Sequence, residues 1–146
     1  MAVFTEISRA DASALVERLA IGRLTHLEPC KGGIENTNYF LDTSTGRFVL
    51  TVFERLTFEQ LPFYLQLMKH LAQRQIPVPE PHADQAGALL HRLCGKPAAV
   101  VGRLEGRHNL TPEATHCASV GAMLARMHLA GQDLAMHQPN LRGLAW

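Results

Sequence analysis

Apolar residues recur at helical spacing in three stretches of the chain. The first stretch follows Ser8, and its stripe consists of Ala12, Leu15, Val16, Leu19 and Ala20. Ser8 and Asp11 match a capping box, and Gly22 stands where a C-terminal cap is expected. This pattern predicts a short amphipathic helix near the start of the sequence.

The second stretch predicts a helix that opens at Thr57, with Gln60 three residues later and Pro62 tolerated in the first turn. Its apolar stripe consists of Leu61, Leu65, Met68 and Leu71. The prolines of the next segment, IPVPEP, cannot continue it. A third helix is predicted with Thr111 as N-cap and Pro112 in its first turn. Its stripe consists of Cys117, Val120, Leu124 and Met127.

The remaining apolar segments are rich in aromatic, β-branched and leucine residues and predict strands. Three strands are predicted around Leu24, at 38–41 and at 48–53, with turns at Gly32-Gly33 and at 44–46. A second hairpin is predicted from 88–93 and 98–104 around the turn at 94–96. Consecutive hairpins predict a five-stranded antiparallel sheet with a helix packed on it, so the expected fold class is α+β.

Composition narrows the classes of partner. The 146 residues suffice for one ordinary domain, with a net charge of +1 and 18% charged residues. That charged fraction is below the roughly 25% of typical soluble proteins, so a nucleic-acid partner is not expected. The longest apolar runs, such as 98–101, are too short to span a membrane, and the first ten residues lack an export signal.

Cysteine and histidine usage argues against a disulfide framework and against a metal site. Cys30, Cys94 and Cys117 are an odd, scattered set, which suits the cytoplasm. His91 lies three residues before Cys94, and His116 adjoins Cys117, but no second pair completes a tetrahedral set. We expect these histidines to be surface or packing residues.

Four segments carry a resemblance to a known family: GGIENTNYFLDTSTGRFVLTVFE, LPFYLQLMKHLAQRQIPVPEP, GKPAAVVGRLEG and GAMLARMHLA. They resemble the homoserine kinase branch of the aminoglycoside phosphotransferase and choline kinase-like superfamily, over the whole chain. The resemblance implies a kinase-like N-terminal lobe at 1–104. It also implies a linker and the first helix of an incomplete C-terminal lobe at 105–146.

The resemblance also implies which residues meet ATP. Gly32, Gly33, Asn36 and Asn38 fall on the turn that folds over the phosphates, where glycines admit close backbone approach. The alternative for this turn is a plain hairpin. In addition, Val101, Gly102, Arg103 and Leu104 match the segment whose backbone faces the adenine edge. Their alternative is an ordinary buried strand.

This sequence departs from the wider superfamily at the ion pair that grips the phosphates. Where most members have a strand-three lysine and a helix glutamate, this chain has Thr51 and Tyr64. The homoserine kinase branch is similar in carrying threonine there. A threonine can donate a hydrogen bond but brings no positive charge. Lys31 and Arg55 are candidate cations, the latter by strand alternation from Thr51; the alternative is a solvated surface charge for each.

The catalytic segment of the superfamily is absent from these 146 residues. The family uses an aspartate, an asparagine a few residues later and a second aspartate for Mg²⁺. Only HADQAGA, at His82, resembles it in letters, and it lies before the second hairpin. We expect the catalytic residues and magnesium ligands in a missing lobe and no turnover by this piece.

The resemblance therefore implies ATP-dependent phosphorylation of the side-chain hydroxyl of homoserine, in threonine biosynthesis. One alternative is another small acceptor in the same fold, such as choline or an amino sugar. Another is a non-catalytic domain that binds a nucleotide or a protein. The apolar stripe of the predicted helix from Thr111 to Ala130 would lack its lobe, so self-association through this helix is expected.

Overall fold

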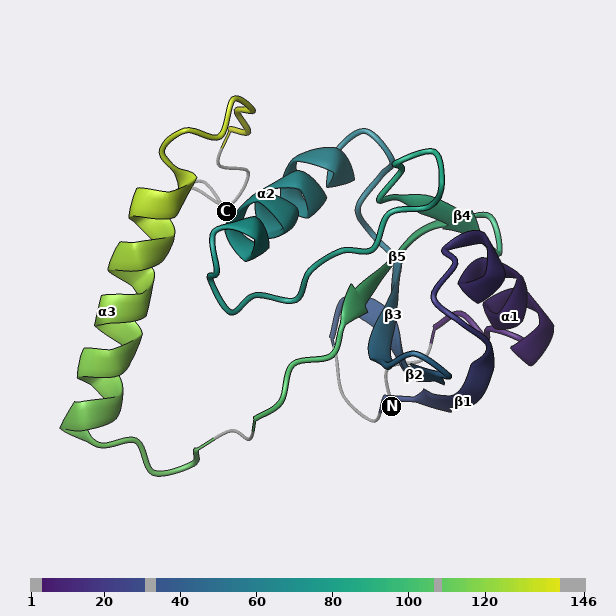
Figure 1. The fold of residues 1–146 in the computed structure, drawn as a ribbon, viewed down its shortest axis with the longest axis horizontal. Helices are drawn as coiled ribbons and strands as arrows, with labels where there is room; N and C mark the ends of the chain where they lie inside the picture. Colours follow the sequence, from purple (N-terminus) through teal and green to yellow (C-terminus); the bar gives the residue numbers. More distant parts are fainter. Residues whose placement is uncertain (1–3, 31–33, 107–108, 140–146) are drawn as a thin grey trace.

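The computed structural model describes residues 4–30, 34–106 and 109–139 (Figure 1). Within these ranges the chain forms, in order, α1 (Arg9–Arg18), β1 (Leu24–Pro29), β2 (Asn36–Thr43), β3 (Arg47–Phe53), α2 (Leu61–Gln73), β4 (His91–Leu93), β5 (Lys96–Gly102) and α3 (Ala114–Gly131). This order confirms the predicted succession of helices and strands.

The strands form one five-stranded antiparallel sheet in the order β1-β2-β3-β5-β4. β3 is central, and its Thr51 lies opposite Asn38 of β2 and Ala99 of β5. The predicted α+β class and meander are therefore confirmed. The second hairpin differs in its bounds, because β4 begins only at His91; Cys94 and Gly95 form its turn with positive φ.

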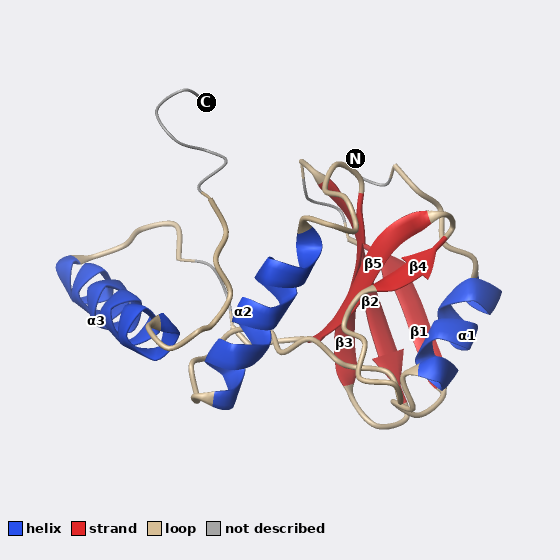
Figure 2. Ribbon diagram, turned by 90° about the horizontal axis from the view of Figure 1, so that it is seen from above, coloured by secondary structure: helices blue, strands red, loops and turns tan. Residues whose placement is uncertain are grey.

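One face of the sheet is sealed by α1 (Figure 2). Period-two alternation sends Tyr39 and Leu41 of β2 and Leu50 and Val52 of β3 to this side, where they pack with the buried stripe of α1. We call this side the sealed face. It contains the larger hydrophobic core of the described residues and provides most of the apolar burial.

The other face is covered in part by α2. Leu65 of α2 packs with Leu89 and Ala99, and half-buried Phe53 lies against them. Figure 2 shows α2 on the opposite side of the sheet from α1, with α3 beyond it. α2 therefore covers only the β5 side and the Phe53 end of this face.

The ends of the helices show where local prediction held and where it failed. The amide of Asp11 donates to Ser8 Oγ at 3.1 Å, as predicted for α1. The expected C-terminal cap at Gly22 was wrong, because Ala20 takes the left-handed conformation with φ 53° and its amide donates to Glu17. Gly22 has φ 90° in the turn that follows, where a Cβ would lie 2.5 Å from Ser44 Oγ.

The start of α3 also differs from the prediction. Thr111 is not the N-cap, because the helix begins only at Ala114, and the amide and hydroxyl of Thr111 both donate to Asn109 Oδ1, at 3.0 and 3.4 Å. Pro112 therefore precedes the first turn, in which it was predicted. Glu113 caps the helix instead, in a capping box with His116.

For α2 the predicted opening at Thr57 was wrong, because Gln60 is the N-cap and the helix begins at Leu61. Gln60 Oε1 accepts the amide of Thr57 at 3.1 Å in the turn before the helix, and Pro62 lies in the first turn as predicted.

α3 stands away from the sheet and buries none of its residues (Figure 1). Near its C-terminal end, Arg126 donates to the carbonyl of Gln75, and the Ala130 carbonyl lies 2.9 Å from His70 Nε2. Val120 and Leu124 are 60% and 49% exposed. Among the described residues, no helix is long and apolar enough to cross a membrane.

Candidate functional site

The uncovered part of the face opposite α1 brings several predicted site residues together. Asn38 and Phe40 of β2 and Val49 and Thr51 of β3 are half-buried, and each alternates with a residue of the sealed face. Val101 of β5 lies beside Val49 in register. We call these five residues, Asn38, Phe40, Val49, Thr51 and Val101, the open face.

The open face contains one polar row and one apolar row. In the polar row, Thr51 Oγ1 donates to Asn38 Oδ1 at 2.7 Å. The Asn38 carbonyl also accepts the amide of Cys30 at 2.9 Å, which holds the end of β1 beside this row. No hydrogen bond to Asn38 Nδ2 is present in the described part of the chain. The row therefore retains an amide donor for a ligand.

The apolar row crosses three strands. Phe40 of β2, Val49 of β3 and Val101 of β5 are aligned by the register of the sheet. A flat aromatic ligand could stack on such a row, and the polar row would then lie against its hydrophilic part. This division predicts the orientation of a nucleotide: base near Val49 and Val101, phosphates near Asn38 and Thr51.

The predicted adenine segment follows the apolar row. The amide of Gly102 donates to the carbonyl of Glu80 at 3.0 Å, and the amide of Arg103 donates to that of Arg47 at 3.0 Å. These two amides are therefore already bonded to backbone carbonyls. Leu104 comes next and makes no hydrogen bond with any described residue. Its backbone N–H and C=O are the groups that this segment leaves for a base edge.

The open face as defined does not include several other predicted residues. Gly32, Gly33 and Lys31 lie outside the described residues. Asn36 opens β2 opposite Phe53 and is half-buried. The alternation that was to align Arg55 with Thr51 was wrong, because β3 ends at Phe53 and Arg55 is exposed beyond it.

Tyr64 lies on α2, where a glutamate would stand in most of the superfamily. It is half-buried, and its ring meets Phe63 edge-on at 5.5 Å between centroids. Thr51 has no ammonium group, and Tyr64 has no carboxylate. These two positions therefore cannot form the usual lysine–glutamate pair.

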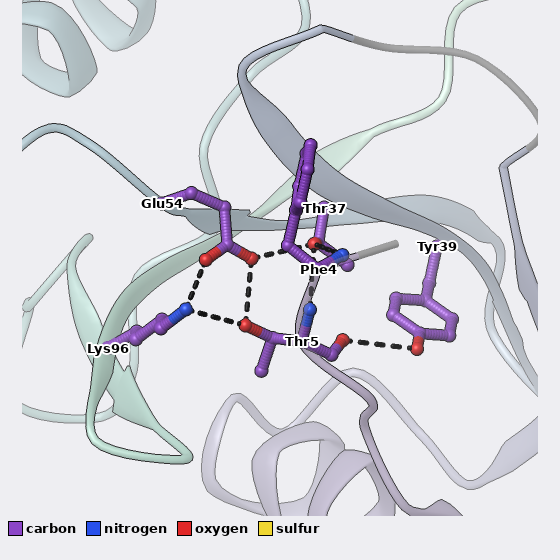
Figure 3. A network of polar contacts seen from close by, with 6 residues as sticks. All are labelled: Phe4, Thr5, Thr37, Tyr39, Glu54 and Lys96. Atoms are coloured by element: carbon purple, nitrogen blue, oxygen red, sulfur yellow. Dashed lines mark hydrogen bonds and ion pairs between the residues drawn. The ribbon is translucent and has the colours of Figure 1, made fainter. Parts of the chain in front are cut away.

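A polar network that sequence reasoning missed lies on the sealed side of the sheet (Figure 3). Glu54 follows β3, and its side chain is 9% exposed. Its carboxylate accepts from Thr37 at 2.7 Å and from Thr5 at 2.8 Å, and it forms an ion pair with Lys96. Burial alone would raise the pKa of Glu54, but hydrogen bonds from Lys96, Thr37 and Thr5 lower it below its usual value.

This network fixes the strand that carries the polar row. Thr37 is fully buried between Asn36 and Asn38, and its Oγ1 also accepts the amides of Phe4 and Thr5 at 2.9 and 3.2 Å. The start of β2 is thereby tied to the N-terminal segment. Strand alternation places Thr37 inward from sequence alone, but its partners lie too far along the chain for a local pattern to reveal.

The HxD segment at His82 has a structural role. Asp84 Oδ1 accepts the amides of Ala86 and Ala88 at 3.0 and 2.9 Å, which closes the loop before β4. The hydrogen bond from the Ala88 amide is the main cause that lowers the pKa of Asp84. Burial lowers the pKa of His82, whose ring lies edge-on to Phe48. Asp84 is therefore occupied by its own loop.

A cavity elsewhere in the molecule is separate from the open face. A cavity of about 210 Å³ lies between α2 and residues 87–90, and it touches no residue of the open face. Within the described residues, no group of three or more His, Cys, Asp or Glu side chains could hold a metal ion.

The chain belongs to the phosphotransferase enzyme family, whose model matches residues 26–146. It is 64% identical over its full length to a homoserine kinase of Polaromonas naphthalenivorans (strain CJ2), covering 46% of that protein. It is 53% identical over its full length to a homoserine kinase of Janthinobacterium sp. (strain Marseille), covering 45% of it. The chain therefore spans less than half the length of these relatives.

The fold is shared with a solved kinase of low sequence similarity. Spectinomycin phosphotransferase APH(9)-Ia, in complex with ADP and spectinomycin, superposes with a TM-score of 0.65. The identity is 13%, over 86% of this chain and 39% of that one. The predicted kinase-like small lobe is thereby confirmed as a fold.

Proposed function

We propose that this chain is the nucleotide-binding part of an ATP-dependent kinase that phosphorylates the side-chain hydroxyl of homoserine, a step of threonine biosynthesis. Its family membership and its similarity to proteins named homoserine kinase support the reaction. The observation that carries the binding role is the open face, where Thr51 and Asn38 are hydrogen-bonded beside an apolar row. We place the protein in the cytoplasm on cysteine usage alone.

In the reaction, the hydroxyl oxygen of homoserine forms a bond to the γ-phosphorus of ATP. The bond from that phosphorus to the β-phosphate oxygen breaks, ADP leaves, and the hydroxyl proton is released. Such transfers depend on positioning and on stabilising negative charge. The role of this chain in the reaction is to hold the nucleotide, because its sequence contains no segment that matches the catalytic segment of the family.

Each part of the nucleotide is assigned to a part of the site. The backbone of Leu104 meets the adenine edge, and Val49 and Val101 contact its ring. Asn38 Nδ2 donates a hydrogen bond toward the phosphates, and the Thr51 hydroxyl, which donates to Asn38 Oδ1, orients that amide. We also assign Gly32 and Gly33, which lie outside the described residues, to phosphate binding, a role predicted from sequence and family resemblance.

Magnesium is assigned to the remainder of the kinase. The described residues contain no set of three suitable side chains, so we derive no step through the metal from this chain. We do not assign Asp84 to the metal, because its Oδ1 accepts two loop amides and it belongs to no group of three ligands among the described residues. We therefore propose that the 146 residues alone bind ATP without turnover.

Calorimetric titration with ATP and Mg²⁺ tests the binding role. The wild-type chain should bind ATP, and Gly33→Ala should weaken binding because a Cβ would obstruct the phosphates. Gly46→Ala is the matched control, since its Cβ would meet Phe48 at an ordinary 3.4 Å in the turn between β2 and β3. Absence of ATP binding by the wild-type chain would contradict the proposal.

The acceptor is tested on the full-length protein. Initial rates with homoserine, choline and an amino sugar, each with ATP, distinguish the possible substrates by kcat/KM. Homoserine should give the highest value. A higher kcat/KM for either other acceptor would overturn the homoserine assignment while leaving the nucleotide site intact.

A further inference from the structure

The proposed nucleotide site lacks an obvious cation for the phosphates. ATP carries several negative charges, and Thr51 offers only a neutral hydroxyl to them. Lys96 is engaged with Glu54 on the sealed side (Figure 3). Arg55 lies beyond the end of β3 and is not aligned with Thr51. Neither Lys96 nor Arg55 therefore supplies a positive charge to the open face.

Arg103 reaches it from an anchored backbone position. Its amide donates to the carbonyl of Arg47 at 3.0 Å, which extends the pairing of β5 with β3 by one residue. Its guanidinium carbon lies 4.1 Å from the ring centroid of Phe40. Because Phe40 is on β2 and β3 lies between β2 and β5, the side chain crosses the central strand over the open face.

The guanidinium is available for a ligand. Among the described residues, Arg103 forms no ion pair with a carboxylate, and the nearby Glu105 pairs instead with Arg47. Stacking on Phe40 uses the flat face of the guanidinium and leaves its in-plane N–H groups to donate. Those donors have the planar geometry that phosphate oxygens accept.

The charge of Arg103 is also felt at the end of β1. Burial raises the pKa of the Cys30 thiol, and the positive charge of Arg103 acts against that rise. The amide of Cys30 is bonded to the carbonyl of Asn38 in the polar row. The guanidinium therefore lies within electrostatic reach of the row to which we assign the phosphates.

We propose that the guanidinium of Arg103, supported by the ring of Phe40, supplies the positive charge that holds the phosphates of the bound nucleotide. It replaces the strand-three lysine of related kinases. The inference rests on the proposed function and deepens it. It gives Arg103 a side-chain role in addition to its place in the adenine segment.

The test compares ligands that share a base and differ in phosphates. Adenosine, ADP and ATP are titrated against wild type, Arg103→Gln and Arg103→Lys. Arg103→Gln should lower the affinity for ATP by about tenfold, the affinity for ADP by less, and the affinity for adenosine by less than about twofold. Arg103→Lys should recover part of the loss, and higher salt should reduce the difference between wild type and Arg103→Gln.

Arg92→Gln is the matched control. The Arg92 guanidinium also stacks on a phenylalanine, 4.2 Å from the Phe58 centroid, but Arg92 is on edge strand β4. Its loss should leave the affinity for all three ligands unchanged. Circular dichroism melting of each variant verifies that folding is retained.

Three outcomes would overturn the inference. Equal weakening of all three ligands by Arg103→Gln would indicate a contact with the base, and tighter adenosine binding would indicate that Arg103 obstructs it. Unchanged ATP affinity would remove any role for the side chain. In these cases the proposed function survives, whereas failure of the wild-type chain to bind either adenosine or ATP would refute both.

Discussion

The two faces of the sheet use the same strands for different purposes. On the sealed face, Leu41 and Leu50 are fully buried against the core that includes α1. On the open face, their strand neighbours Phe40 and Val49 remain half-buried. Because side chains alternate along a strand, one residue can stabilise the fold while the next contacts a ligand. Stability and binding should therefore respond to different substitutions.

Leu50→Ala should give the largest effect. Leu50 is fully buried on the central strand, and its truncation should lower the free energy of unfolding by about 3 kcal/mol. Its neighbour Val49, on the open face, serves as the comparison, and Val49→Ala should cost about 1 kcal/mol. Urea unfolding followed by circular dichroism measures both. Equal losses for the two variants would contradict the division between faces.

Glu54→Gln should come next, with a loss of about 2 kcal/mol in the free energy of unfolding, because Lys96 and two threonines lose a carboxylate partner. Glu17→Gln, on the exposed side of α1, is the control and should change it by less than about 0.5 kcal/mol. Chemical unfolding at pH 7 makes the comparison.

The same carboxylate predicts a pH dependence. The folded pKa of Glu54 is lowered, so its contribution is fully present above the unfolded value of about 4.3 and is lost as pH falls through the folded pKa. The difference in unfolding free energy between wild type and Glu54→Gln should be constant from about pH 7 to 5 and shrink below about pH 4. A difference that grows on acidification would refute this sign.

Thr51→Val should affect binding more than stability. It removes the donor to Asn38 from the open face, so ATP affinity should fall about fivefold while unfolding changes by less than about 1 kcal/mol. Thr25→Val, at an exposed position of β1, is the matched control and should bind ATP as wild type does. A stability loss without an affinity loss would make the Thr51 bond purely structural.

The smallest effect on stability is expected from α3, where we propose that the exposed apolar stripe mediates self-association. Leu124→Glu places a charge in that stripe and should shift sedimentation toward monomer, with little change in unfolding free energy. Ala122→Glu adds the same charge on another side of the helix and should not. A wild-type chain that is monomeric at all concentrations would contradict self-association.

Local patterns predicted local structure well. The Ser8–Asp11 cap, the strands at 38–41 and 48–53 and the turn at 44–46 each depend on residues within a few positions of one another. The predicted N-cap at Thr111 was wrong, because the Asn109 side chain binds the Thr111 amide in a local turn and Glu113 caps the helix.

Distant contacts explain what sequence could not predict. Lys96 meets Glu54 across 42 positions, and Arg103 meets Phe40 from another strand. Such pairs depend on strand order and register, which alternation alone does not determine. The predicted site residues Asn38 and Thr51 do lie together, but Arg103, whose guanidinium lies over Phe40 on the same face, was assigned only a backbone role from sequence.

Methyl NMR spectra of the chain, recorded while ATP is added, test the central claim most directly. Val49 and Val101 lie on the open face, and their strand neighbours Leu50, Val52 and Val100 are buried in the sealed core. The account predicts that the methyl signals of Val49 and Val101 shift on titration while those of Leu50, Val52 and Val100 remain in place. Shifts confined to the sealed face, or none on either face, would contradict it.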